Sequence, residues 1–130
     1  YKLSEVPEGV NITYDVKVPE ELDVDYSDLG VIIGNLIDNS KHAVSRVLQN
    51  NMDAYIDIKL ICHADNIVFI IKNNYINTPE ARNIDYYKNH GRGIGSVRKI
   101  IKKYDGMYDV KKTEYEYVTS VSVGVRNMRM

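Results

Sequence analysis

The feature that most constrains the fold of this chain is a long stripe of mainly apolar residues with helical spacing. The stripe recurs at steps of three and four residues and consists of Leu29, Ile32, Ile33, Leu36, Ser40, Ala43, Val44 and Val47. Ser27 or Asp28 can cap a helix that begins there and runs to about Gln49. A helix with one such face needs a second layer to bury it, which the rest of the chain must supply.

Five runs with the character of strands can form that second layer. The first alternates apolar and polar residues until Pro19 stops it, and the next two form a hairpin with a short polar turn. A last pair of strands completes the chain. The runs cover residues 10–18, 55–62, 67–72, 107–112 and 117–125.

A second helix follows a long polar connection that runs from Asn73 to Gly91. The apolar stripe of this helix consists of Val97, Ile100, Ile101 and Tyr104. Asp105 and Gly106 end the helix. One hairpin directly follows each helix. This order predicts an α/β (α+β) two-layer sandwich, with both helices packed on one face of a mixed or antiparallel sheet.

The composition indicates one globular domain over residues 1–130, because no low-complexity linker divides the chain. A formal net charge of −1 gives no support to nucleic-acid binding. The single cysteine, Cys62, excludes a disulfide framework and a metal site built on thiolates. No apolar stretch approaches the ~18 residues that span a bilayer, and Tyr1 is not an initiator Met. We therefore expect a part of a longer protein, with any membrane spans of the parent outside it.

The polar side of the first helix carries a ridge of side chains opposite the apolar stripe. Asn35, Asn39, His42 and Arg46 follow one another at steps of four, three and four residues. Asn35 and Asn39 stand one turn apart and can point into the same space. Asn is a poor helix former because it competes for backbone hydrogen bonds. When the ridge is taken alone, a solvated helix face is still its simpler explanation.

A glycine-rich turn, Gly91-x-Gly93-x-Gly95, opens the second helix. Glycines let the backbone approach an anion closely, and the N–H groups and dipole at a helix start favour phosphate. The turn is not a dinucleotide-binding fingerprint, because no strand feeds it, and it lacks the Gly-Lys-Ser/Thr of a P-loop. Taken alone, it is either a phosphate site or a simple tight turn.

Found together in this order, the two features resemble the GHKL nucleotide-binding superfamily, which includes gyrase B, histidine kinases and MutL. Residues 35–43 look like its N box, and residues 90–101 look like its second glycine box. The His-Gly start of the second box is similar to that of the peptide quorum-sensing receptor kinases. The resemblance covers nearly the whole chain and implies the Bergerat-type ATP-binding fold.

The resemblance also implies roles for the matching residues, with ATP and Mg²⁺ as cofactors. Asn39 matches the N-box Asn that binds Mg²⁺, a cation that prefers oxygen ligands. Asn35 stands where hydrolytic members have a general-base Glu, and an amide cannot take a proton from water. This favours phosphoryl transfer over hydrolysis. The expected catalytic residues are Asn35 and Asn39, and the expected nucleotide-binding residues are Asn35, Asn39, His42, Asn73, His90, Gly91, Gly93 and Thr119.

The first glycine box departs from the family pattern. Family members usually have Asp-x-Gly-x-Gly after the second hairpin strand, where the Asp accepts the adenine amino group, but residues 71–75 here read Ile-Lys-Asn-Asn-Tyr. Asn73 falls where the Asp is expected, and its side-chain oxygen can still accept that hydrogen bond. The loop after it takes the place of the ATP lid, in which Tyr75, Tyr86 and Tyr87 either cover the nucleotide or pack the loop down.

The expected function is that of the catalytic domain of a bacterial sensor histidine kinase in two-component signal transduction. Such a domain binds Mg-ATP and donates the γ-phosphoryl group to a histidine on a separate dimerisation domain of the same homodimeric parent, from which a response regulator receives it. None of the three histidines here looks like that acceptor, so this chain alone is not expected to phosphorylate itself. We expect a cytoplasmic domain of a membrane-bound sensor.

Three other interpretations stay open. A degenerate family member would act as a protein-interaction module without nucleotide, which the changed first glycine box favours and the intact Asn39 and Gly91-x-Gly93 oppose. An anti-sigma-factor-type Ser/Thr kinase shares the fold and both boxes. An ATPase of the gyrase or MutL kind fits least well, because Asn35 replaces the general-base Glu.

Overall fold

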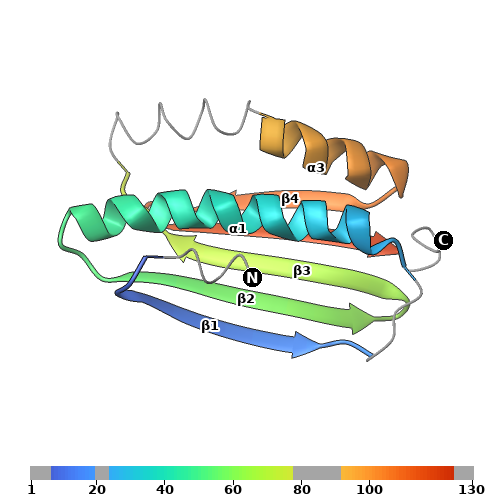
Figure 1. Cartoon of the computed structure of the whole chain (residues 1–130), viewed down its shortest axis with the longest axis horizontal. Helices are drawn as coiled ribbons and strands as arrows, with labels where there is room; N and C mark the ends of the chain where they lie inside the picture. The colour runs from blue at the N-terminus through green and yellow to red at the C-terminus, as the bar shows by residue number, and fades with distance from the viewer. Residues whose placement is uncertain (1–6, 20–23, 78–91, 125–130) are drawn as a thin grey trace.

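The computed structural model describes residues 7–19, 24–77 and 92–124, without the side chains of residues 92–94. Within these ranges a five-stranded sheet carries two helices on one face (Figure 1). The elements are β1 (Val10–Lys17), α1 (Tyr26–Gln49), β2 (Ala54–His63), β3 (Asn66–Asn74), α3 (Arg92–Lys103), β4 (Met107–Lys112) and β5 (Glu116–Gly124). In the described ranges, neither helix has the length and apolar character needed to cross a membrane.

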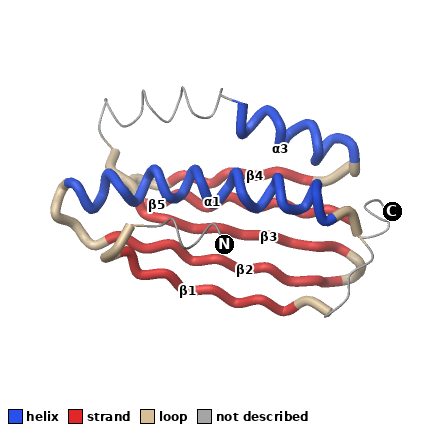
Figure 2. The backbone as a smooth tube through the Cα atoms, in the orientation of Figure 1, coloured by secondary structure: helices blue, strands red, loops and turns tan. Residues whose placement is uncertain are grey.

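The sheet has the strand order β1-β2-β3-β5-β4 and is mixed. β1 pairs with β2 in parallel, whereas the β2–β3, β3–β5 and β4–β5 pairs are antiparallel. The parallel pair arises because α1 crosses over the sheet between β1 and β2, while a short turn suffices for the antiparallel β2–β3 pair. Both helices lie on the same side of the sheet (Figure 2). The predicted two-layer α+β fold is therefore confirmed.

The N-cap of α1 is Asp25, so the prediction of Ser27 or Asp28 was wrong. The Asp25 carboxylate accepts hydrogen bonds from the backbone N–H of Ser27 at 3.0 Å and of Asp28 at 3.3 Å. A cap residue has to adopt the extended conformation that Asp25 has, whereas Ser27 and Asp28 already lie in the first turn. Asp28 still contributes a negative charge that favours the helix start.

α1 buries a broad face because it contacts β2, β3 and α3. Its buried residues are Leu29, Ile32, Gly34, Leu36, Ile37, Ser40, Val44 and Val47. The predicted stripe is confirmed except at Ile33 and Ala43, which are half-buried, and Ile37 is buried although the stripe omitted it. Alternate residues of the strands, such as Ile67 and Phe69 of β3, complete the core between the layers.

β3 reaches Asn74, two residues further than the sequence predicted. Asn73 pairs with Ile56 of β2 and with Tyr117 of β5, so the first residues of the expected polar connection belong to the sheet. The N–H of Tyr75 also donates to a carbonyl in the turn between β4 and β5, which continues the hydrogen bonding beyond the strand. These polar residues stay in the strand because their side chains have hydrogen-bond partners in α1 and β2.

α3 begins at Arg92, so Gly93 and Gly95 lie within its first turn rather than in a turn before it. At the other end, Asp105 has a φ of 50°, and the N–H of Gly106 donates at 2.8 Å to the carbonyl five residues earlier. This arrangement ends the helix at the predicted residues.

A polar cluster joins the C-terminal end of α3 to the N-terminal end of α1, since the two helices run antiparallel (Figure 1). Oδ2 of Asp28 accepts a hydrogen bond from the Tyr104 hydroxyl and lies 2.9 Å from Nζ of Lys103. The bond from Tyr104, followed by that from Lys103, holds the pKa of Asp28 below its ordinary value. The cluster fixes α3 on α1 at the end opposite to the glycine box.

The variant Gly106→Ala is expected to lower the free energy of unfolding by about 2 kcal/mol, as at other overpacked positions. A Cβ on Gly106 would meet the backbone carbonyl oxygen of Ser122 at 2.6 Å, and β5 lies inside the sheet and cannot easily move. Gly30→Ala is the control, because no atom lies within 4 Å of its Cβ. Alanine there should stabilise the helix by about 0.5–1 kcal/mol. Urea denaturation measures both, and equal effects would contradict the clash.

The variant Asp28→Asn is expected to lower the free energy of unfolding by about 1 kcal/mol at neutral pH, the scale of a partly exposed charged pair. Because the folded pKa lies below the ordinary value of 3.8, the wild-type protein keeps this contribution above that pH and loses it as the pH falls toward the folded pKa. Urea denaturation should therefore show a constant difference from the variant near neutral pH that shrinks below pH 3.8. A difference that persists unchanged in acid would contradict this assignment.

Candidate functional site

Predicted site residues on α1, β3 and β5 lie near one another where the second half of α1 passes over the end of β3 (Figure 1). Ser40 of α1 contacts Asn73 of β3, and Asn39 adjoins Ser40. Thr119 of β5 is paired with Ile71 of β3, two residues from Asn73 on the same inner face of the sheet. Three elements that are distant in the sequence therefore supply one region.

The centre of this region is a buried hydrogen bond between α1 and β3. The hydroxyl of Ser40 donates to Oδ1 of Asn73 at 2.8 Å, and the two residues are only 3% and 5% exposed. Nδ2 of Asn73 donates to the carbonyl of Asn74 at 3.0 Å. Within the described ranges Ser40 and Asn73 are the buried polar residues, and each satisfies the other. Ser40 was predicted as part of the apolar stripe, and its bond to Asn73 was not predicted.

Asn74, the next residue, faces the opposite side of the sheet and fastens the start of β2. Its Oδ1 accepts from the N–H of Tyr55 at 3.0 Å, and its Nδ2 donates to the carbonyl of Asp53 at 2.7 Å. The side chain thus bonds to the main chain as a neighbouring strand would. Of the two adjacent asparagines, one holds the sheet together and the other faces α1.

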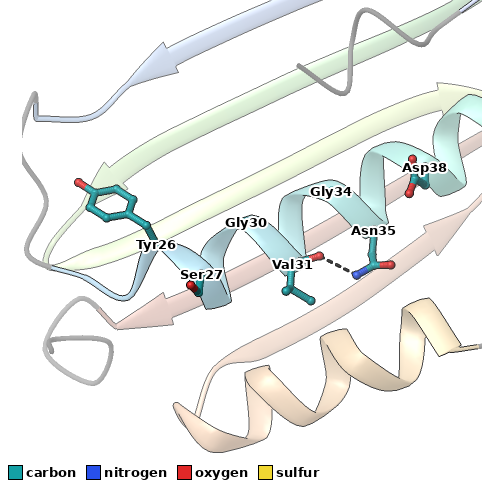
Figure 3. A pocket seen from close by; sticks show the side chains of 7 residues that line it. All are labelled: Tyr26, Ser27, Gly30, Val31, Gly34, Asn35 and Asp38. Atoms are coloured by element: carbon teal, nitrogen blue, oxygen red, sulfur yellow. Dashed lines mark hydrogen bonds between the residues drawn. The ribbon is translucent and has the colours of Figure 1, made fainter.

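Asn35 lies in a groove that follows the exposed side of α1. The groove has a volume of about 440 Å³ and is lined by Tyr26, Ser27, Gly30, Val31, Gly34, Asn35 and Asp38 (Figure 3). Two glycines leave room in its floor. Nδ2 of Asn35 donates to the carbonyl of Val31 at 2.8 Å, and both side chains point toward α3 (Figure 3). This bond uses one of the two hydrogens of the amide nitrogen and fixes the side chain of Asn35 against its own helix.

The other predicted residues of the ridge lie further along α1. Asn39 is half-buried one turn after Asn35, as the spacing predicted, and His42 is exposed. Nζ of Lys41 lies 3.6 Å from Oδ1 of Asp38. Lys41 thus forms an ion pair within its own helix. The binding of phosphate or metal by Asn39 or His42 stays a prediction.

An aromatic cluster lies beside Asn73 at the end of the sheet. The ring centroids of Tyr75 and Tyr117 are 5.0 Å apart, and Nζ of Lys112 lies 5.0 Å from each centroid. Tyr75 is buried, and its hydroxyl donates to a backbone carbonyl of the β4–β5 turn. Of the two roles open to Tyr75, the structure shows packing. Tyr117 and Lys112 were not among the predicted site residues, because only the pairing of β4 with β5 brings them together.

The second glycine box is described only in part. His90 and Gly91 lie outside the described residues, as do Tyr86 and Tyr87 of the connection. Gly93 lies in the first turn of α3, which begins above the middle of α1 (Figure 1). The start of α3 is thus on the same side of the sheet as the Ser40–Asn73 pair.

Ser40→Ala is expected to lower the free energy of unfolding by about 1–2 kcal/mol, because Oδ1 of Asn73 would lose its buried donor. Ser45→Ala is the matched control, since the Ser45 hydroxyl donates at 2.8 Å to the Lys41 carbonyl of its own helix. Both variants gain the same helix propensity of alanine. Thermal or urea denaturation should therefore separate them, and equal stabilities would show that the Ser40–Asn73 bond contributes nothing.

Comparison with known proteins gives both a family and similar folds. The family model of the GHKL domain matches residues 24–124. No curated protein sequence matches the chain. The histidine kinase domain of the blue-light activated kinase EL346 from Erythrobacter litoralis superposes with a TM-score of 0.70 at 12% identity, over 94% of this chain and 54% of that chain.

Two further histidine kinases superpose in the same way. The nucleotide-free catalytic domain of ThkA gives a TM-score of 0.67 at 14% identity, over 92% of this chain and 82% of that chain. AdeS from Acinetobacter baumannii gives 0.67 at 15% identity, over 95% and 57%. This chain therefore spans little more than half of the EL346 and AdeS chains. Likeness at these identities shows the fold, whereas the family model covers most of the sequence, and the chain therefore belongs to the GHKL domain family.

Proposed function

We propose that this GHKL domain binds Mg-ATP and donates the γ-phosphoryl group to a histidine on a separate dimerisation domain of its parent protein. The observation that carries the proposal is the placement of Asn35 and Asn39 on successive turns of α1, beside the buried Ser40–Asn73 pair. The similarity of the fold to histidine kinase catalytic domains supports it.

Asn39 is the proposed ligand of Mg²⁺. This cation is usually held by a few protein oxygens together with substrate phosphates, and a neutral amide oxygen suits a site to which ATP brings the negative charge. In the part of the chain that the structure describes, no group of three or more His, Cys, Asp or Glu residues could hold a metal by itself. The ion would therefore enter with the nucleotide.

Asn35 supports phosphoryl transfer rather than hydrolysis. Its nitrogen donates to the Val31 carbonyl, and neither the nitrogen nor the oxygen of an amide can act as a general base. Water near the γ-phosphate would not be activated by this residue. The work of the site would then be positioning and neutralisation of charge, with the nucleophile supplied by another domain.

The other nucleotide contacts follow from the places of the residues. Asn73 would meet the base, with Thr119 near it on the inner face of the sheet. His42, His90, Gly91 and Gly93 would serve the phosphates, and the start of α3 offers backbone N–H groups for this purpose.

The partners of the domain follow from the same proposal. The acceptor histidine would lie on the dimerisation domain of the same homodimeric parent, and a response regulator would receive the phosphoryl group from it. The His-Gly start of the second glycine box supports the peptide quorum-sensing branch. The parent would be a membrane-bound bacterial sensor with this domain on the cytoplasmic side.

Titration calorimetry with Mg-ADP and with a non-hydrolysable ATP analogue tests the proposal. We expect saturable binding that Asn39→Ala weakens at least about tenfold, the effect of losing a contact to a charged group. Asn11→Ala changes an exposed amide on the edge strand β1 and should leave the affinity unchanged.

The opposite outcome would favour the interaction module. If the folded protein binds neither nucleotide at millimolar concentration, the proposal is wrong. The observation that favours this second candidate is Tyr75, which stands at a glycine position of the first glycine box and is packed against Tyr117.

A further inference from the structure

We infer that the Ser40–Asn73 pair makes the site accept 6-oxopurine nucleotides as well as 6-aminopurine nucleotides. The inference rests on the proposed function, because it takes Asn73 as the residue that meets the 6-position of the purine. It concerns which purine is bound, so it can fail while nucleotide binding itself stands.

The amide of Asn73 has hydrogen-bonding capacity beyond its two bonds within the protein. An asparagine amide has two acceptor positions on its oxygen and two hydrogens on its nitrogen. Oδ1 of Asn73 accepts one hydrogen bond from Ser40, and Nδ2 donates one to the carbonyl of Asn74. Each atom has capacity for one more. A purine that reaches Asn73 therefore meets one acceptor and one donor.

The two protein partners also fix the orientation of the amide. The carbonyl of Asn74 can only accept, so the nitrogen of Asn73 has to face it. The hydroxyl of Ser40 then donates to the oxygen. If the amide were rotated by half a turn, its oxygen would face the Asn74 carbonyl. Two acceptors would then lie together with no hydrogen between them, which is unfavourable. The donor and the acceptor are thus both held in place.

Either class of purine finds a partner in this arrangement. The 6-amino group of adenine can donate to the oxygen of Asn73, and the 6-oxo group of hypoxanthine can accept from its nitrogen. Both contacts join neutral groups, so the two affinities should differ by less than about tenfold. A carboxylate would offer acceptors alone and would oppose a 6-oxo group, and a site of that kind rejects the analogue.

The amide of Asn73 is the group that would decide which purine is bound. Its partners in the sheet are Ile56 and Tyr117, and Ser40 lies against it from α1; none of these three carries a carboxylate or an ammonium group. The ammonium group of Lys112 lies against the rings of Tyr75 and Tyr117. Asn73 is 5% exposed, so a base that meets it would do so inside the protein, where a donor or acceptor left without a partner is costly.

The test compares Mg-ADP with Mg-IDP, the inosine nucleotide, by calorimetric titration of the same protein. Hypoxanthine has the 6-oxo group but lacks the 2-amino group of guanine, so it adds no bulk to the base. We expect a Kd for IDP within about tenfold of that for ADP. Binding of ADP with IDP more than about 100-fold weaker would overturn the inference and leave the proposed function intact. Binding of neither would overturn both.

Asn73→Asp is the matched variant, because it replaces the amide by a carboxylate of the same shape. The preference for ADP over IDP should rise at least about tenfold, chiefly through weaker binding of IDP. Asn11→Asp makes the same change of charge at an exposed position of β1 and should not alter the preference. An unchanged preference in folded Asn73→Asp would show that Asn73 does not read the base, which would overturn the inference.

Ser40→Ala supplies a second variant that adds no charge to the core. It removes the donor from Oδ1 of Asn73 and so leaves an acceptor that only a donating base can satisfy. The preference for ADP over IDP should therefore increase. A movement toward IDP would contradict the arrangement of donor and acceptor. If Asn73→Asp does not fold, this variant and the wild-type ratio decide the question.

Discussion

The packing of α1 across the sheet is the constraint on which the rest of the molecule depends. Val44 of the helix and Ile56 of β2 are fully buried, and the helix is held in one rotation by the stripe to which Val44 belongs. Ser40 lies in that stripe, so its hydroxyl has to find a partner inside the protein. Asn73 provides the partner. The rotation that buries the stripe is also the one that turns Asn35 toward α3 (Figure 3).

The fold class could be predicted from the sequence because its signals are local. Helical spacing marks α1 and α3, alternation marks the strands, and β4 has the predicted bounds. The end of β3 could not be predicted, because Asn73 and Asn74 have the composition of a loop. They belong to a strand because their side chains bind Ser40 and Asp53, which are 33 and 21 residues away. Such distant partners leave no periodic signal.

The candidate site also contains some features that the sequence predicts and others that it does not. The spacing of Asn35 and Asn39 on one helix was readable, since it needs nothing beyond 3.6 residues per turn. The partner of Asn73 and the edge-to-face contact of Tyr75 with Tyr117 could not be predicted, because both depend on the position of one element on another. The changed first glycine box becomes intelligible only with these contacts. Its amide is held by α1 and its tyrosine is packed into the sheet.

The parallel pairing of β1 with β2 has a consequence for the order of folding. β2 and β3 are joined by a tight turn that is closed by the pairing of His63 with Asn66, whereas the connection between β1 and β2 contains the whole of α1. Closing the larger loop costs more chain entropy, and such non-local pairing is slow. Tyr14 is also 68% exposed, so little burial holds this edge strand. β1 is therefore expected to dock last and to detach first, while the antiparallel strands and α1 keep the Ser40–Asn73 bond intact.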